Sequence, residues 1–365
     1  RAGGIETFIL GLIDGMPFGS LVIYTSSQKG SVEFDRQLFE KFGARVIRDR
    51  AKILLPTPRI TKRAIKILKN EAIIRVWFGA AAPLALMANA LRKSGVSNIV
   101  ALSHGHEVWW AKIPIFKQLL KKIISDVNYF CYLGNFTKSQ IMKVSNEVEK
   151  MVQISPGIDT DHFSPKSASA QLIAKYRLEG RRVIICVARL VHRKGQDQLI
   201  AAMPTIVESH PDAILLLVGV GPIKQMLENS ARQLRITHKI VFTGRVSHNE
   251  LPDYLAISEI FAMPVRSRFL GLEVEGLGIV YLEASACGKP VVVGNSGGAT
   301  DAVLDGVTGL LVEASKVDEI SNAICKLLDD PVKAKQMGQA GRDWVVANWQ
   351  MSSWSKKFNQ LLLSN

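Results

Sequence analysis

"RVIICVARLVHRKGQDQLIAAM" (182–203) opens with an apolar run rich in β-branched residues, continues through a short basic loop and ends in an amphipathic helical pattern. A near-continuous apolar run of this length is typical of a parallel strand that is covered by helices on both faces. A strand followed by such a helix is one βα unit, from which doubly wound sheets are built. This stretch therefore predicts an α/β fold.

The same alternation of apolar runs and helical patterns recurs on both sides of this unit. Strand candidates lie at 21–25, 73–79, 99–104, 129–133 and 151–155 in the first half, and at 182–190, 213–219, 240–244, 260–265, 290–294 and 308–313 in the second. Two successive arrays predict two Rossmann-like doubly wound parallel-sheet domains, 1–160 and 170–340, and the Pro-, Gly- and Ser-rich segment 155–170 marks their boundary. A C-terminal helix, 345–365, is expected to join the first domain. Because ligands of such sheets bind at the carboxyl ends of strands, the two domains are expected to face a ligand cleft.

Composition excludes several classes of protein. The chain has 365 residues, of which 47% are hydrophobic and 21% charged, as is usual for soluble globular proteins. No apolar run approaches the roughly 18–20 residues of a membrane-spanning helix, and no secretory pattern opens the sequence, so a cytoplasmic location is expected. The four cysteines form no CxxC pair and are interpreted as buried thiols rather than metal ligands: Cys131, Cys186, Cys287 and Cys325.

Positive charge is concentrated in the first half of the chain. The formal net charge is +14, of which residues 1–165 carry +10. Segments 59–70 and 113–124 both pattern as amphipathic helices with a face of lysine and arginine. A solvated helix face and a surface for anionic phospholipid headgroups both explain such a pattern. A nucleic-acid partner is not favoured, because no aromatic stacking residues are interleaved with the basic ones.

Two cations follow the strand quoted first. Arg189 stands at the end of the strand and Lys194 in the loop beyond it, five positions later. Fixed cations above a strand end suit a diphosphate leaving group, although a solvated basic loop explains either residue alone.

A second candidate motif is "EGLGIVYLEA" (275–284). Its glycines permit a sharp turn before a helix whose first N–H groups, those of Gly278, Ile279 and Val280, form an anion site. Glu275 and Glu283 then reach two different parts of one ligand. Singly, the first carboxylate is explained as a charge at a helix N-terminus and the second as an exposed helix residue.

Together with "NSGGATDAVLDGVTGLLVE" (295–313), these residues resemble the retaining GT-B glycosyltransferases of family GT4, which use nucleotide-sugar donors. The stretches "RAGGIETFI" (1–9), "LPTP" (55–58), "VWFGAAAPLALMA" (76–88) and "SHGHEV" (103–108) are similar to the members that use GDP-mannose and act on phosphatidylinositol mannosides. The resemblance covers nearly the whole chain. It implies a first strand and a "PP" loop before position 1, and it leaves Asp301 where the family usually has Glu.

The resemblance implies donor-binding roles in the second domain: the diphosphate for Arg189 and Lys194, the transferred sugar for Glu275, the ribose for Glu283, the base for the backbone of Val246, and the phosphates for the helix start at Gly278, Ile279 and Val280. In the first domain it implies a loop at Gly3 and Gly4 that closes over the sugar phosphate. It also implies an active-site histidine at His104, in preference to His106.

Two other motif matches are rejected. Asp159 and Asp161 match the DxD pattern of metal-dependent glycosyltransferases, but they stand in the "GxDxxxFxP" connection of GT4 members. No metal or cofactor is expected, because paired cations and a helix N-terminus already stabilise the leaving charge. "LVGVGP" (217–222) is not a dinucleotide fingerprint, because Lys224 stands where that motif needs glycine.

The sequence thus predicts a retaining mannosyltransferase, peripheral on the inner face of the plasma membrane, that moves mannose from GDP-mannose to a phosphatidylinositol mannoside. The family implies that the leaving phosphate assists the incoming hydroxyl on one face, without the carboxylate pair of retaining glycosidases. One alternative is a GT4 enzyme that uses a UDP- or ADP-sugar and a non-lipid acceptor. Another is a non-catalytic protein that binds a nucleotide sugar or a lipid. The oligomeric state does not follow from the sequence.

Overall fold

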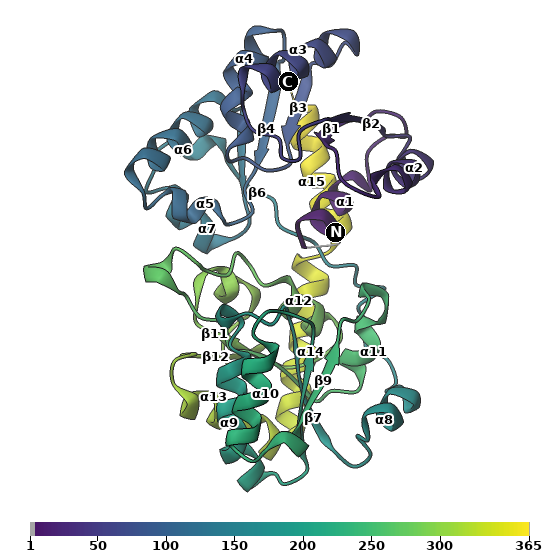
Figure 1. Cartoon of the computed structure of the whole chain (residues 1–365), viewed down its shortest axis with the longest axis vertical. Coiled ribbons are helices and arrows are strands. Elements are labelled where there is room, and N and C mark those ends of the chain that lie inside the picture. Colours follow the sequence, from purple (N-terminus) through teal and green to yellow (C-terminus); the bar gives the residue numbers. More distant parts are fainter. Residues whose placement is uncertain (1–3, 365) are drawn as a thin grey trace. The chain divides into compact units, whose positions relative to one another are not determined.

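A computed structural model describes residues 4–364 of the chain, and the side chains of residues 6–364. The chain divides into two compact units, each an α/β structure (Figure 1). Unit 1 comprises Arg1–Gly157 and Met351–Asn365, and unit 2 comprises Ile158–Gln350. The chain therefore enters unit 2 near the start of the Pro-, Gly- and Ser-rich segment and leaves it ten residues beyond the expected end at 340.

Unit 2 is built on one six-stranded parallel sheet in the order β12-β11-β10-β7-β8-β9. The strands are β7 (Arg182–Val187), β8 (Ala213–Val218), β9 (Ile240–Gly244), β10 (Ile260–Met263), β11 (Val291–Gly294) and β12 (Gly309–Val312). All six match strands expected from the sequence. The order reverses between β7 and β10, and this topological switch point is where doubly wound sheets bind their ligands.

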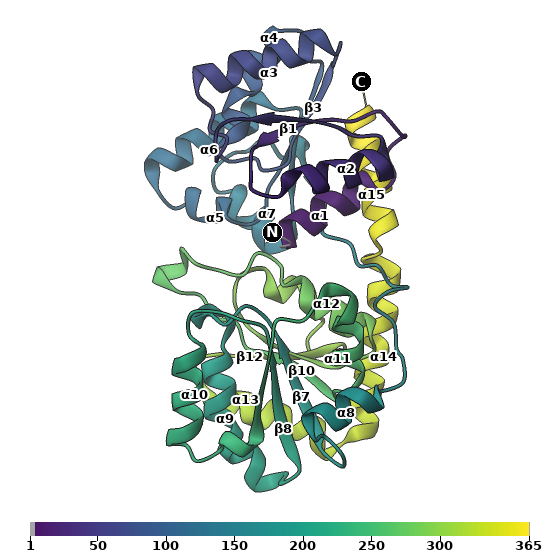
Figure 2. The same ribbon diagram turned by 45° about the vertical axis from the view of Figure 1, so that its right-hand side comes forward.

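Helices cover both faces of this sheet, which explains its nearly continuous apolar strands. In Figure 2, α9 and α10 lie on one side of the strands and α14 lies on the other. The helices are α8 (Ala170–Tyr176), α9 (Gln196–Ser209), α10 (Lys224–Gln233), α11 (Leu251–Ala256), α12 (Ile279–Ala286), α13 (Val317–Asp329) and α14 (Pro331–Asn348).

Unit 1 contains a parallel sheet in the order β3-β4-β5-β6 and a separate parallel pair, β1-β2. The strands are β1 (Val22–Ser26), β2 (Arg45–Asp49), β3 (Arg75–Phe78), β4 (Asn98–Leu102), β5 (Tyr129–Tyr132) and β6 (Met151–Gln153). The helices are α1 (Gly4–Ile13), α2 (Ser31–Phe42), α3 (Pro58–Asn70), α4 (Ala88–Lys93), α5 (Glu107–Trp110), α6 (Pro114–Asp126), α7 (Asn135–Ile141) and α15 (Met351–Leu363). Only β2 has no counterpart among the expected strands, because "RVIRD" is charged and mostly half-buried.

Side chains of β3, β4 and β5 alternate between two packed faces of the sheet. Phe78, Ala101 and Phe130 belong to the core that also includes residues of α3, α4 and α6. On the other face, the ring of Trp77 packs edge-on against Phe358 of α15, with their centroids 4.7 Å apart. The side-chain NH2 of buried Asn98 lies within hydrogen-bond distance, 3.0–3.1 Å, of three main-chain carbonyl oxygens in and just after the last turn of α15, those of Leu361, Leu362 and Ser364. The C-terminal helix is thus an integral part of unit 1.

Two local expectations are corrected by the structure. The predicted helix 345–365 is two helices: the backbone leaves the helical conformation at Trp349 (φ −124°), after α14 ends at Asn348 and before α15 begins at Met351, and the Trp349 carbonyl oxygen accepts a 2.7 Å hydrogen bond from the Ile158 N–H. Gly4 is the first residue of helix α1 rather than part of a loop. The sequence of α1 favours the helix, since its apolar residues follow Glu6 in the first turn, where a carboxylate complements the helix dipole. Gly3 lies outside the described residues.

Candidate functional site

The loops that follow β7 and β10 are held together at the switch point of unit 2. Gly195 has φ +77°, and a Cβ atom there would lie 2.0 Å from the carbonyl oxygen of Pro264, so only glycine allows this approach. Arg266 donates two hydrogen bonds, of 3.0 and 2.6 Å, to the Asp197 carboxylate in the first turn of α9. The Arg266 N–H also bonds the Arg193 carbonyl oxygen at 2.9 Å. These contacts place Lys194 beside the segment that carries Glu275.

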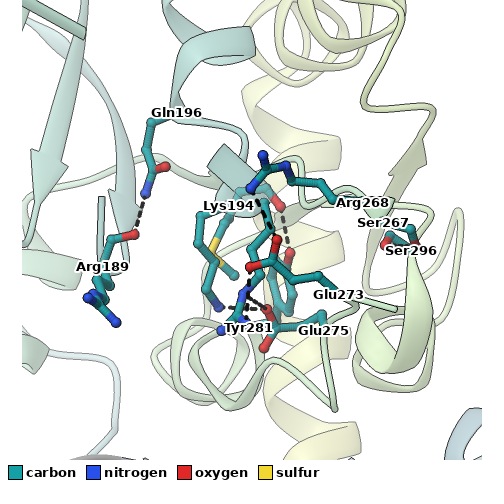
Figure 3. Close-up of polar contacts among 11 residues, drawn as sticks. Arg189, Lys194, Gln196, Ser267, Arg268, Glu273, Glu275, Tyr281 and Ser296 are labelled. Atoms are coloured by element: carbon teal, nitrogen blue, oxygen red, sulfur yellow. Dashed lines mark hydrogen bonds and ion pairs between the residues drawn. The ribbon is translucent and has the colours of Figure 1, made fainter. Parts of the chain in front are cut away.

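Lys194 and Glu275 bind each other directly. The Lys194 ammonium group donates a 2.7 Å hydrogen bond to the Glu275 carboxylate, and the two side chains are only 13% and 12% exposed (Figure 3). A second carboxylate, Glu273, lies near the same arginine as Glu275, since Arg193 is 3.8 Å from Glu273 and 4.0 Å from Glu275. Glu273 also accepts a 3.1 Å bond from Arg268.

The backbone around Glu275 is fixed by the glycine pair of the "NSGGATD" segment. The Gly298 N–H donates a 2.8 Å hydrogen bond to the Glu275 carbonyl oxygen. A Cβ atom at Gly298 would lie 2.0 Å from the carbonyl oxygen of Gly276. This close approach explains the glycine at position 298. It also fixes the position of the backbone from which the Glu275 side chain extends.

Helix α12 begins next to this cluster. Gly278 is its N-cap with φ +79°, and a Cβ atom there would lie 2.5 Å from the Tyr281 ring. The buried Tyr281 hydroxyl donates a 2.5 Å hydrogen bond to the Met263 carbonyl oxygen at the end of β10, which anchors the helix. The first N–H groups of a helix have no acceptor within the helix, so those of Gly278, Ile279 and Val280 remain available to a ligand, and such N–H groups can bind an anion.

Glu283 is buried in α12, not exposed. Glu283 is 7% exposed, and its carboxylate has no hydrogen bond or ion pair within the described part of the chain. Burial without a partner raises the pKa of Glu283 to about 7. A buried carboxylate without a partner in the second turn of this helix is poised to accept hydrogen bonds from hydroxyl groups of a ligand.

Arg189 and Val246 lie at the same edge of the sheet but outside the Lys194–Glu275 cluster. Arg189 follows β7 and is exposed; its carbonyl oxygen accepts a 3.1 Å bond from Gln196, and Figure 3 shows its guanidinium group apart from the two carboxylates. Val246 is half-buried in the loop after β9. The glycines of "LVGVGP" fit these loops together, because a Cβ at Gly219 would lie 2.1 Å from the Ala188 carbonyl oxygen. That packing role explains the motif without a dinucleotide.

In unit 1, His104 follows β4 and is half-buried. Its Nε2 contacts the Gly79 carbonyl oxygen, so Nε2 carries the proton and Nδ1 is the acceptor of the neutral ring. Burial is the largest influence on His104 and lowers its pKa. Buried Glu107 supports this loop by accepting bonds from the Ser103 hydroxyl at 2.8 Å and the His104 N–H at 3.1 Å. His106 is exposed.

The Asp159–Asp161 pair forms a turn. The Asp159 carboxylate accepts hydrogen bonds from the N–H groups of Asp161 and His162, at 3.2 and 3.0 Å. Among the described residues, no group of three or more His, Cys, Asp and Glu side chains could hold a metal ion. Within the same residues, no helix is both long and apolar enough to cross a membrane.

The sequence motifs did not identify Arg193, Arg268 and Glu273. Arg193 stands next to Lys194, but only the lysine of that loop was assigned a role from the sequence. Glu273 precedes Glu275 by two residues. The two-residue spacing from Glu275 was the available signal for Glu273, because residues two apart share a face wherever a chain is extended. The position of Arg268 depends on its paired backbone hydrogen bonds with Glu273, which no spacing encodes.

Comparisons with known proteins support a common family for both units. The family model "Glycosyl transferases group 1" matches residues 169–344. A Mycolicibacterium smegmatis protein named GDP-mannose-dependent alpha-(1-6)-phosphatidylinositol monomannoside mannosyltransferase is 41% identical, over 99% of this chain and 95% of that protein. A Corynebacterium glutamicum relative, named as the enzyme for the monoacylated form of that lipid, is 38% identical over 100% and 95%. A Mycobacterium tuberculosis glycogen synthase is 32% identical over 47% of this chain and 40% of its own.

Solved structures agree on the fold. Anabaena HepE in complex with UDP superposes with a TM-score of 0.82 at 16% identity, over 99% of this chain and 96% of that one. A Rickettsia africae glycosyltransferase superposes with a TM-score of 0.80 at 19% identity, over 99% and 94%. These neighbours are GT-B glycosyltransferases, and the parallel-sheet architecture predicted from the sequence is confirmed. The chain therefore belongs to the glycosyl transferases group 1 family, has the GT-B fold and is a glycosyltransferase.

Proposed function

We propose that the protein is a retaining mannosyltransferase that moves mannose from GDP-mannose to a phosphatidylinositol mannoside. The observation that carries this proposal is the extent of the similarity to the relatives named for that reaction. It spans nearly the whole chain, unit 1 included, whereas the glycogen synthase matches only about half. The family model lies entirely within unit 2, so it accounts for the shared donor chemistry, and the similarity of unit 1 argues for a shared acceptor.

In this proposal the donor binds to unit 2 at the switch point. Lys194, Arg189 and the first N–H groups of α12 neutralise the diphosphate. Glu283 accepts hydrogen bonds from the ribose hydroxyls, and Glu275 accepts one from the mannose. The backbone of Val246 contacts the base.

The reaction then needs little covalent participation by the protein. The bond between the anomeric carbon and the phosphate oxygen breaks, and the acceptor hydroxyl oxygen forms the new bond on the same face. The acceptor proton passes to the leaving diphosphate, whose growing charge Lys194 and the α12 N-terminus stabilise. The neutral His104 acts through Nδ1 as a hydrogen-bond acceptor for the transferred sugar. No metal ion is required in this scheme.

We assign the lipid surface to unit 1. The α3 lysines (Lys62, Lys66 and Lys69) are exposed, while Ile60 and Leu68 of the same helix are buried in the core. Ile53 and Leu55, in the loop before α3, are also exposed. Cations beside exposed apolar side chains suit binding to anionic headgroups at the inner face of the plasma membrane.

The test is a transfer assay with the full chain. The protein is incubated with vesicles that contain phosphatidylinositol monomannoside and with radiolabelled GDP-mannose or UDP-glucose, and label is counted in the extracted lipid. We expect transfer from GDP-mannose only, and none in vesicles that lack the acceptor. Transfer only from UDP-glucose would reject the donor assignment. A thermal midpoint raised by GDP-mannose without any transfer would indicate a non-catalytic binding protein.

A further inference from the structure

The Lys194–Glu275 ion pair joins two residues that the proposed donor separates. Lys194 is assigned to the diphosphate and Glu275 to the sugar, yet their 2.7 Å bond is the shortest contact of the cluster around the two carboxylates. A diphosphate that binds Lys194 therefore competes with Glu275 for the ammonium group. Glu275 is 12% exposed, and a shielded carboxylate that loses its cation is strongly disfavoured unless another cation replaces it.

Arg193 is the cation placed to make that replacement. Its Nε lies 4.0 Å from the same Glu275 oxygen that binds Lys194, which is too long for a hydrogen bond. This Nε is shielded from solvent and has no hydrogen-bond partner within the described residues. The main chain of Arg193 is fixed by the bond from Arg266, so only its side chain needs to move.

The neighbouring carboxylate does not need Arg193. Glu273 accepts a side-chain bond from Arg268 at 3.1 Å, and the two residues also pair through their backbones at 2.9 and 3.2 Å. Arg193 lies 3.8 Å from Glu273, again beyond hydrogen-bonding distance. The unused Nε–H of Arg193 thus lies 4.0 Å from a Glu275 carboxylate whose present partner, Lys194, has another role in the proposed donor complex.

We propose that Arg193 is a positioning residue, which binds Glu275 when the diphosphate engages Lys194 and so holds that carboxylate ready for a hydroxyl of the sugar. The proposal rests on the proposed function, since it assumes a sugar diphosphate in this site. In this proposal different residues recognise the two parts of the donor: Lys194 binds the diphosphate, and Glu275, held by Arg193, binds the sugar. Arg193 then contributes little to the affinity for GDP and much to the advantage of GDP-mannose over GDP.

The test compares Arg193→Gln with the wild type and with Arg232→Gln, which removes an exposed arginine of α10. Dissociation constants for GDP and GDP-mannose are measured by titration calorimetry, and kcat and KM by transfer to the lipid acceptor. For Arg193→Gln we expect the GDP affinity to stay within about twofold of that of the wild type. We expect kcat and the preference for GDP-mannose over GDP to fall ~10- to 100-fold, which is the size of effect that losing one charged hydrogen bond produces. Arg193→Lys should restore part of both. Glu275→Gln should bind GDP roughly 3- to 10-fold more tightly, because the competitor for Lys194 is weakened.

Three outcomes would overturn this role. If Arg193→Gln lost about tenfold or more of its GDP affinity, Arg193 would be a ligand of the diphosphate, because a loss of that size is expected when a charged hydrogen bond is removed. An equal fall in both affinities together with the thermal midpoint would make it a structural brace. Unchanged affinities and kcat would leave it no role in the reaction. If wild type binds neither GDP nor GDP-mannose, the proposed function fails instead, and the same comparison with UDP and UDP-glucose tests Arg193 separately.

Discussion

Replacing Glu283 with Gln should stabilise the protein and weaken its binding of the donor. The Glu283 residue is 7% exposed, and burial raises the pKa of its carboxyl group to about 7, against an ordinary value of 4.5. One pKa unit corresponds to about 1.4 kcal/mol, so ionised Glu283 costs unit 2 about 3 kcal/mol above pH 8. Glutamine keeps the shape of the side chain and removes this charge.

The effect has a defined pH dependence. Folded Glu283 binds its proton more tightly than the unfolded chain does, so its contribution to stability is fully present below pH 4.5 and is lost as the pH rises to about 7. Glu283→Gln should therefore gain about 3 kcal/mol at pH 8.5 and less than about 1 kcal/mol at pH 5. For a unit of this size, the gain at pH 8.5 corresponds to a rise of roughly 6–12 °C in the thermal midpoint.

Donor binding should change in the opposite direction. Ribose hydroxyls donate more strongly to a carboxylate than to an amide oxygen, so GDP affinity should fall about tenfold in the variant. In the wild type the affinity should also fall below pH 7, where Glu283 takes up its proton. The assays are thermal unfolding at pH 5 and 8.5 and calorimetric titration with GDP, with Glu208→Gln on the exposed side of α9 as the charge control. A variant less stable than wild type at both pH values, or one with a pH-independent gain, would refute the reasoning.

Three further changes probe other parts of the structure. Gly298→Ala places a methyl group 2.0 Å from the Gly276 carbonyl oxygen, so the backbone of Glu275 must shift. We expect kcat/KM to fall about tenfold or more. An unchanged kcat/KM would contradict the packing argument. Asn98→Ala removes the NH2 group that binds the carbonyl oxygens at the end of α15 and should cost about 1–3 kcal/mol. Hydrogen exchange should then accelerate in α15 while α9 stays protected, and equal acceleration in both helices would argue against a local effect. Reversing the charge of the α3 lysines should weaken binding to anionic vesicles by roughly 100-fold or more, because each lysine near an anionic surface contributes about 1 kcal/mol. Binding is measured by cosedimentation with the vesicles. If the variant cosediments as the wild type does, α3 is not part of the proposed membrane surface.

The sheets were predictable because their signal is local. Buried parallel strands are apolar on both faces, and the four inner strands of unit 2, β7, β8, β10 and β11, show that pattern. The β2 strand lacks it, since its side chains are charged and mostly half-buried. The break between α14 and α15 was also unpredictable, because the chain there pairs with Ile158, which is far away in the sequence.

The site was predictable only in part, for the same reason. The spacing of Lys194, Glu275 and Gly278 indicated an anion site, because strand ends and helix starts determine where such residues stand. Their pairing with one another depends on the close approach of Gly195 to Pro264, a contact between two loops. The burial of Glu283 depends in the same way on what packs against α12, so its raised pKa was not evident from its position in a helix.

The capture of α15 by unit 1 has a consequence for biosynthesis. Residues 351–363 are translated after all of unit 2, yet they cover the face of the β3-β4 sheet that carries Trp77 and Asn98. At ribosomal speeds of about 5–20 residues per second, the part of unit 1 that precedes Ile158 waits roughly 10–40 s for that helix. During this interval an apolar surface stays uncovered beside a growing polypeptide. Unit 1 is therefore completed only after unit 2 has been translated, although most of its residues precede unit 2 in the chain.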